Sequence, residues 1–343
     1  METTNLLLPS TRMTRMGMIN STFIEDAVIV SEKEQEKEHP NFIESNTSGI
    51  TLEELETNCI VPSFGDNQLT ISHQTFIHRI EEAASMFFAG ETFGNTEIRV
   101  SHKILGRHPS ALTKRKEELK PEDETIYYQR MTFCFHIRTI CREMNGEEVH
   151  LCIGGVRSLN EENLYGKKSP EKFKIFIGWR VRVCSNLMLT CDGLTGRLEV
   201  MCDTDIYIAA LKLFQTFNPE QNLRLLENLG RTMISQEQFC QIIGRLRLYK
   251  ALPASQMKEL PKVILGDSNI NAATKGYIDN PNFGLRGRAK ISCWDLMQLL
   301  NEAAKQSYID KFLERNQNAT DFAVGIQKAL RGEDTENYGW FLR

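Results

Sequence analysis

The chain has 343 residues, of which 41% are hydrophobic and 25% charged, a globular composition that excludes a fibre or a wholly disordered chain. Its formal net charge is −4, and this charge is unevenly distributed. Residues 1–60 hold four basic and eleven acidic side chains, which leaves 37 of the 41 basic and 34 of the 45 acidic side chains for the rest. An acidic N-terminal segment therefore precedes a mildly basic body.

The sequence carries no membrane or secretion signal. No stretch approaches the roughly 18 consecutive apolar residues that span a bilayer, and residues 1–17 lack the basic-then-apolar order of a signal peptide. The nine cysteines include no CxxC pair. We therefore expect reduced thiols, no bound metal or cofactor, and a cytoplasmic protein that does not contact membranes.

Three regions follow one another along the chain. Residues 1–48 are polar, include the charged run 31–38, and bury too little apolar surface to offset the entropy of ordering. The sequence predicts a disordered acidic tail over 1–48, a helix plus an antiparallel β-sheet over 49–202, and a helical half over 203–343 that packs on the sheet. The fold class is therefore α+β.

The middle region begins with a helix and continues with alternating strands. Ser72 can cap a helix that ends at Phe88, with Gly90 just beyond it. Residues 132–142 and 173–183 alternate between apolar and polar side chains, which predicts two strands. A turn over 192–196 and a returning strand over 197–202 follow.

The strand over 132–142 can form a hairpin with the residues that follow Gly146, and two registers are possible for this pairing. A two-residue turn at Asn145-Gly146 would pair Cys141 with His150 and put the apolar residues of the two strands on different faces. We therefore predict a three-residue loop over 144–146, which pairs Cys141 with Val149.

Four positions of this hairpin recur fifty residues later. The positions are Cys134, Cys141, Gly146 and Cys152, and then Cys184, Cys191, Gly196 and Cys202. The match is either a duplicated hairpin or a coincidence.

The last region carries helix start and stop signals, such as the capping box that begins at Ser235. The predicted helices cover 203–217, 219–229, 235–252, 268–277, 292–304 and 320–330.

No catalytic motif is present: HExxH, a Walker loop, GxGxxG and GxSxG are all absent. Asp203 and Asp205 lie at a strand-to-helix junction, where acidic residues favour the helix N-terminus. Asn186 is a polar residue in an apolar run, and either a structural or a functional role is open to it.

The polar positions of the middle strands are mostly basic. The only acidic residues at these polar positions are Glu97 and Glu148. Because arginine suits phosphate, this pattern predicts a surface for a polyanion, although the matching acids could lie on loops. The predicted contact residues of the middle region are Arg99, Lys103, Arg130, His136, Arg138, Arg142, Lys174, Arg180 and Arg182.

The helical half adds two further basic segments. One is 245–250, which contains Arg245, Arg247 and Lys250. The other contains Arg286, Arg288 and Lys290 among glycines and is predicted to be a mobile loop that closes over a phosphate backbone. Trp179 and Tyr127 are candidates for base stacking, but Trp179 has the parity of the apolar face and is predicted to lie in the core.

Three blocks of sequence, 98–107, 176–193 and 293–310, together resemble an uncharacterised bacterial family of unknown function. The family is carried on mobile elements and is distantly similar to the phage/plasmid-like proteins. The resemblance covers about residues 60–343 and implies a mobile-element context, without implying any catalytic residue.

The first hypothesis is a non-enzymatic accessory protein that binds DNA or RNA through a basic sheet face. The second is a protein that modulates a host factor, with its partner recognised through the acidic tail. The third is a phosphate-handling enzyme in which Asp192, Asp203 and Asp205 lie near Arg180 and Arg182.

Overall fold

The computed structural model describes residues 40–61, 70–111, 113–162 and 170–343. Most of the predicted acidic tail, residues 1–39, lies outside the described residues. The prediction is wrong for residues 40–48, because Phe42 and Ile43 are both 0% exposed and a strand begins at Ser48. The apolar pair Phe42 and Ile43 anchors this segment, although most of its polar residues remain exposed.

The central element is a seven-stranded antiparallel sheet, which confirms the predicted α+β class. Its strand order is β1-β2-β5-β6-β7-β8, and β9 also pairs with β7. The strands are β1 (Ser48–Ile50), β2 (Glu97–Val100), β5 (Arg130–Met144), β6 (Glu147–Ser158), β7 (Glu171–Val181), β8 (Leu187–Met188) and β9 (Leu198–Val200).

The hairpin between β5 and β6 has the register of a two-residue turn, so the predicted three-residue loop is wrong. Cys141 pairs with His150 across a two-residue turn, in which Asn145 and Gly146 have φ angles of 51° and 84°. Both angles are positive, as a type I′ turn requires. The apolar residues of the two strands still share one face, because the register shifts between His136 and Cys141. After this irregularity, the alternation of β5 is reversed, so even-numbered and odd-numbered residues exchange faces.

The segment around Cys184–Cys202 does not repeat that hairpin. After β7 the chain turns at Ser185, whose φ is 59°, and forms the short strand β8. It then turns again at Gly196, and β9 pairs with the start of β7. The predicted return strand is confirmed, but the shared cysteine spacing belongs to two different structures.

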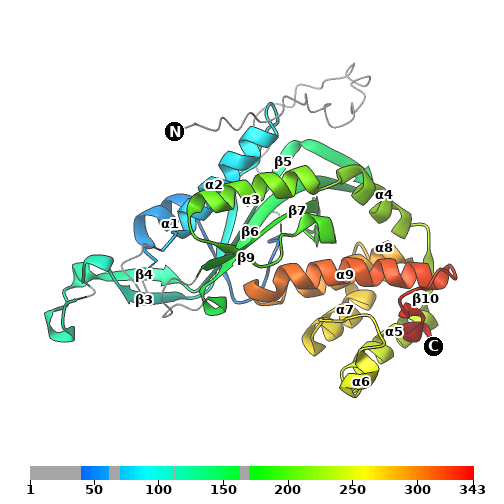
Figure 1. The fold of residues 1–343 in the computed structure, drawn as a ribbon. Coiled ribbons are helices and arrows are strands. Elements are labelled where there is room, and N and C mark those ends of the chain that lie inside the picture. Colours follow the sequence, from blue (N-terminus) through cyan, green and yellow to red (C-terminus); the bar gives the residue numbers. More distant parts are fainter. Residues whose placement is uncertain (1–39, 62–69, 112, 163–169) are drawn as a thin grey trace, which may run out of the picture. The chain divides into compact units, whose positions relative to one another are not determined.

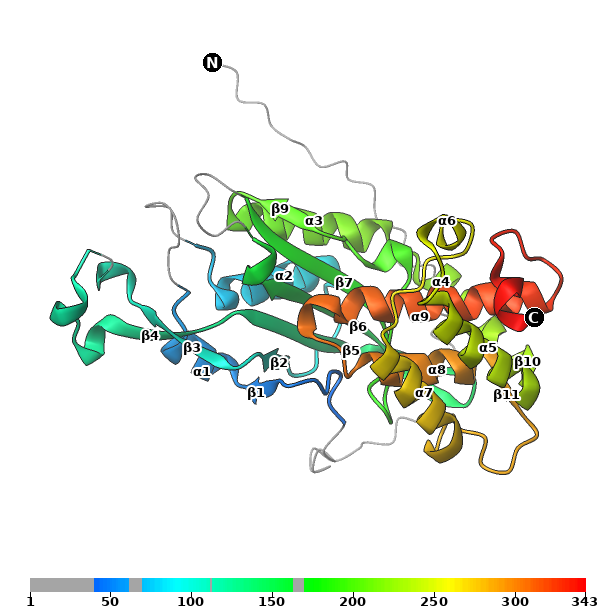
Figure 2. The ribbon, with the colours of Figure 1, turned by 90° about the horizontal axis from the view of Figure 1, so that it is seen from below.

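Helices cover both faces of the sheet (Figures 1 and 2). On the apolar face, α2 (His73–Phe87) and α3 (Asp203–Thr216) pack together, and Phe76 of α2 contacts Phe133 and Phe173. As predicted, Ser72 caps α2 by accepting a hydrogen bond from the Thr75 amide. On the opposite face, α9 (Ile309–Leu330) lies over β5, β6 and β8.

The helical half follows the predicted order, with two strands that sequence patterns did not indicate. These strands, β10 (Met233–Ser235) and β11 (Lys290–Ser292), pair antiparallel and each leads directly into a helix. Helix α9 begins eleven residues before its predicted start at residue 320. Besides α3, the helices of this half are α4 (Pro219–Leu229), α5 (Gln236–Tyr249), α6 (Ala254–Met257), α7 (Asp267–Asp279), α8 (Cys293–Ala304) and α9.

Two smaller elements complete the described fold. Helix α1 (Leu52–Asn58) was not predicted and packs against α2. Strands β3 (Lys103–Arg107) and β4 (Glu124–Tyr128) form a separate hairpin that extends away from the sheet (Figure 1). No helix among the described residues is both long and apolar enough to cross a membrane.

Candidate functional site

Strand pairing places five of the nine basic residues predicted for the middle region on one face of the sheet, which we call the polar face, and Arg182, one residue beyond β7, continues their alternation. Glu97 and Glu148 lie on the same face, as the alternation predicts. The six basic residues are Arg99, Arg130, His136, Lys174, Arg180 and Arg182.

The other three basic residues of the middle region do not join them. Arg138 lies within the irregular part of β5, and Arg142 pairs with Val149 and so points to the opposite face. Lys103 belongs to the separate β3–β4 hairpin. Fewer basic residues therefore share the polar face than the alternation predicted. In β5 the reason is the register shift, which moves each later residue to the other face of the sheet.

Residues 40–47, which we call the N-terminal strap, cover one part of the polar face. Arg99 donates hydrogen bonds to the carbonyl and hydroxyl oxygens of Thr47, at 3.1 and 3.2 Å. Arg180 lies 5.7 Å from the Phe42 ring centroid and donates to Glu97 at 3.0 Å and to Ser185 at 2.8 Å. These two arginines therefore hold the strap on the sheet.

Helix α9 covers another part of the polar face and supplies acidic side chains that the alternation along the strands did not predict. Lys174 is 5% exposed, and its Nζ lies 2.6 Å from Glu314 and 3.3 Å from Glu161. It also donates to the Asp310 carbonyl at 2.9 Å. The expectation that Lys174 and Arg180 form an open polyanion surface is thus wrong for this conformation, because both are enclosed and paired with carboxylates.

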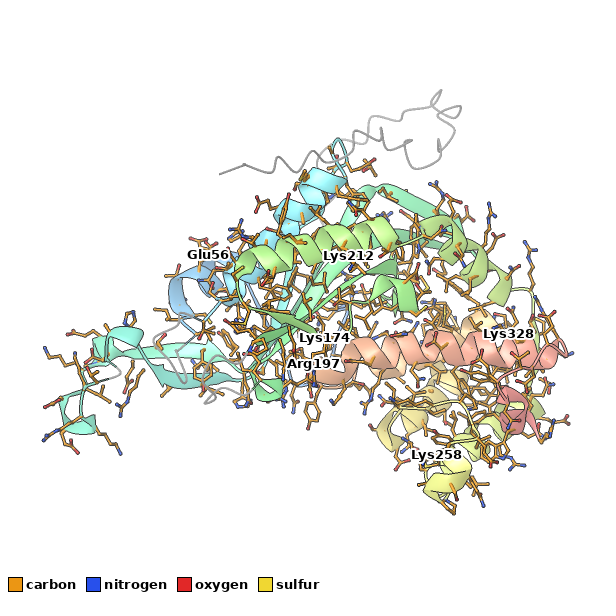
Figure 3. All side chains as sticks on the ribbon, in the orientation of Figure 1. Glu56, Lys174, Arg197, Lys212, Lys258 and Lys328 are labelled. Atoms are coloured by element: carbon orange, nitrogen blue, oxygen red, sulfur yellow. The ribbon has the colours of Figure 1, made fainter. Side chains whose placement is uncertain are left out.

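One edge of the polar face remains open, at the N-terminus of α9. We call it the α9 rim and define it as Arg130, Arg197, Tyr308 and Lys311. The side chains of Arg197 and Lys311 are 54% and 57% exposed and lie 3.7 and 3.5 Å from Glu161. Figure 3 shows Arg197 close to Lys174, beside the start of α9.

The rim is cationic on its outside and acidic beneath. Arg130 lies 3.2 Å from Asp310, and its guanidinium is 5.8 Å from the Tyr308 ring centroid. The side chains of Glu161 and Asp310 are only 10% exposed, whereas residue Tyr308 is 65% exposed. A ligand that approaches this edge therefore meets cations and an aromatic ring before it meets carboxylates.

The predicted contact residues of the helical half lie away from the sheet, near the β10–β11 ribbon. The Arg286 side chain donates to the Pro281 carbonyl at 2.7 Å, and Arg288 lies 3.3 Å from Asp295. Lys290 is an exposed residue of β11. The predicted closure of this loop over a phosphate backbone remains a prediction.

The residues proposed for an enzyme do not converge. Asp203 binds Arg79 at 2.6 Å, and this guanidinium lowers the pKa of Asp203. Asp205 accepts hydrogen bonds from the backbone amides of Met201 and Cys202, which lower its pKa. Asp205 completes the capping box at the start of α3, whose N-cap is Cys202, whereas Asp203 pairs with Arg79 of α2 and Arg180 lies on the polar face beside Glu97.

Asp192 has a separate structural role. It accepts hydrogen bonds from the Asn218 backbone amide at 3.1 Å and from the Asn222 side chain. Within the described ranges, no group of three His, Cys, Asp or Glu residues is placed to hold a metal ion.

A second buried charge cluster was missed by the sequence analysis. The side chain of Arg157 is 0% exposed, donates to the Ile71 carbonyl and to Glu171, and lies 3.4 Å from Glu162. Burial raises the pKa of both glutamates despite Arg157, and burial lowers the pKa of the neighbouring His73 to about 3. The sequence does contain a signal for this burial. Arg157 stands at an alternate position to Leu151 and Ile153 in the same strand, so it points to the apolar face.

Asn186 has a structural role. It is 0% exposed and donates to the carbonyl and side-chain oxygens of Gln298 on α8, at 3.1 and 3.0 Å. This contact joins the bend after β7 to the helical half.

Comparison with known proteins identifies a family. Residues 23–342 match the family model described as "Domain of unknown function, B. Theta Gene description (DUF3871)". No curated protein and no solved structure matches the chain. Because the match covers nearly all of the 343 residues, the chain belongs to this bacterial family of unknown function.

Proposed function

We propose that this protein is a non-enzymatic nucleic-acid-binding accessory protein of a mobile element, acting in the cytoplasm through the α9 rim. The observation that carries the proposal is the grouping of the exposed cations Arg197 and Lys311 beside the exposed Tyr308 ring. The mobile-element context comes from the resemblance of three sequence blocks to an uncharacterised bacterial family carried on mobile elements, which is distantly similar to the phage/plasmid-like proteins.

The chemistry of the rim suits a phosphate backbone. Four cations, Arg130, Lys174, Arg197 and Lys311, surround three carboxylates, those of Glu161, Asp310 and Glu314, which leaves a surplus of one positive charge. The positive charge lies on the outside, because Arg197 and Lys311 are exposed whereas the carboxylates they approach, those of Glu161 and Asp310, are only 10% exposed. The N-terminus of the 22-residue helix α9 adds a positive dipole end at the same place.

The proposal is tested by fluorescence anisotropy with labelled single-stranded DNA, duplex DNA and RNA across a salt series. The double variant Arg197→Ala/Lys311→Ala should weaken binding and reduce the slope of log K against log salt by about 1.4–1.8, which is the loss of two phosphate contacts. The full-length protein is used throughout.

The matched control removes two exposed lysines elsewhere, Lys212→Ala/Lys258→Ala, and changes the net charge equally. Figure 3 shows both lysines away from Arg197. This control should keep the slope of the unmodified protein. Absence of binding at about 50 mM salt, or equal effects of the two double variants, would refute the proposal.

A further inference from the structure

Resting on the proposed function, we infer that the α9 rim takes a single-stranded nucleic acid, with one unpaired base stacked on Tyr308 and neighbouring phosphates at Arg197 and Lys311. Tyr308 is 65% exposed, precedes the first residue of α9, and has its ring 5.8 Å from the Arg130 guanidinium. An aromatic plane in this position offers a contact that a paired base cannot use, since the faces of paired bases are covered by their neighbours.

The spacing of charge also favours a single strand. The two most exposed cations of the rim, Arg197 and Lys311, lie within 4 Å of the same carboxylate, that of Glu161, so they form one compact patch that can reach two neighbouring phosphates. Duplex DNA presents one phosphate charge per roughly 1.7 Å of its axis and rewards an extended basic track. The polar face lacks such a track, because Lys174 and Arg180 are enclosed beneath α9 and near Phe42.

Two buried hydroxyl groups beside Arg130 point to a polar ligand group at the same place. Ser158 lies directly opposite Arg130 in the β5–β6 ladder, and Thr132 lies two residues further along the same face. They are 3% and 0% exposed, and the Oγ atom of each has no hydrogen-bond partner among the described residues. Because both hydroxyl groups are shielded from solvent, a sugar or phosphate oxygen at the rim would satisfy them through a bridging water or after the Arg130 side chain moves.

The test compares four labelled probes on the full-length protein by fluorescence anisotropy. The probes are a single-stranded oligothymidine of about 16 nucleotides, an abasic oligomer of the same length, the corresponding duplex, and inorganic polyphosphate. We expect the oligothymidine to bind at least about fivefold more tightly than the abasic oligomer, which carries the same phosphates without bases.

Tyr308 variants then locate the preference. Tyr308→Leu should abolish the difference between the oligothymidine and the abasic oligomer, whereas Tyr308→Phe, which keeps the ring, should retain it. Because Tyr308 is exposed, both variants are expected to fold, and their far-ultraviolet circular dichroism should match that of the unmodified protein.

The outcomes separate this inference from the proposed function. Failure of all probes to bind refutes both. Equal affinity for the oligothymidine and the abasic oligomer, or tighter binding of the duplex, overturns the single-strand inference and leaves the phosphate-binding proposal in place. An unchanged base preference in Tyr308→Leu also overturns it, because the stacking group would then lie elsewhere.

Discussion

Among the predicted contact residues, Lys174 has the environment that differs most from an open binding surface, because it is only 5% exposed. Replacement of Lys174 by methionine is expected to lower the free energy of unfolding by about 3 kcal/mol, the low end for removal of one partner from a buried ion pair. The low end applies because Glu161 keeps Lys311 and Arg197 nearby, and the Glu314 side chain is 35% exposed. Urea denaturation followed by circular dichroism measures the change.

Arg182→Met is the control for this substitution. Arg182 lies on the same face, but its side chain is 50% exposed and its partner Glu148 is 42% exposed, so the expected loss is about 0–1 kcal/mol. If the two variants lose equal stability, then Lys174 is not buried beneath α9, and the polar face is accessible to solvent at this position.

At the same scale, alternation predicts which side chains share a face but not what they pair with. The alternation correctly predicts that Arg130, Lys174 and Arg180 lie on the same face of the sheet. The carboxylates of Asp310 and Glu314 come from a helix more than 130 residues further along the chain. Only the tertiary packing of α9 on the sheet brings these charges together, and no local pattern contains that information.

The β5–β6 hairpin carries a prediction about an element. Gly146 has a φ of 84°, which a residue with a side chain adopts only with strain, so Gly146→Ala should destabilise the protein by about 1 kcal/mol. Gly244→Ala is the matched control, since Gly244 lies inside α5 and an added methyl group would contact nothing within 4 Å. That change should stabilise the protein by about 0.5–1 kcal/mol.

Thermal unfolding of the two glycine variants should therefore show shifts of opposite sign. A stabilising effect of Gly146→Ala would contradict the positive φ angle at Gly146 and with it the two-residue turn. The turn was mispredicted because the sequence argument assumed a regular β5, whereas the register shift after His136 restores the burial of both apolar faces.

Helix α9 shows why element boundaries were harder to predict than element types. Its first half was not predicted because polar residues interrupt the apolar period, yet several of them face inward. Asn316 is 0% exposed and donates to the Phe312 carbonyl, and Asp310 lies beside Arg130. A helix that covers a polar sheet face buries polar side chains, so hydrophobic periodicity marks only the part that covers apolar surface.

Within residues 40–343, the strap, the sheet and the helical half share their contacts. The backbone amides of Glu44 and Ser45 donate to the Lys305 carbonyl at the end of α8, and the Phe42 ring lies 6.0 Å from Phe312 of α9. Asn186 adds a contact between the sheet and α8. We therefore expect the sheet and the helical half to unfold in one transition, although they are consecutive regions of the sequence.

Phe42→Ala tests this coupling. Phe42 is 0% exposed and packs between Arg180 of β7 and Phe312 of α9, so its truncation should cost about 3–5 kcal/mol. Because the side chain touches both regions, hydrogen exchange should speed up together in β7 and α9 peptides. Tyr308→Ala removes an exposed aromatic ring and should change stability by no more than about 0.5 kcal/mol. Faster exchange in only one region after Phe42→Ala would mean that the sheet and the helices unfold as separate units.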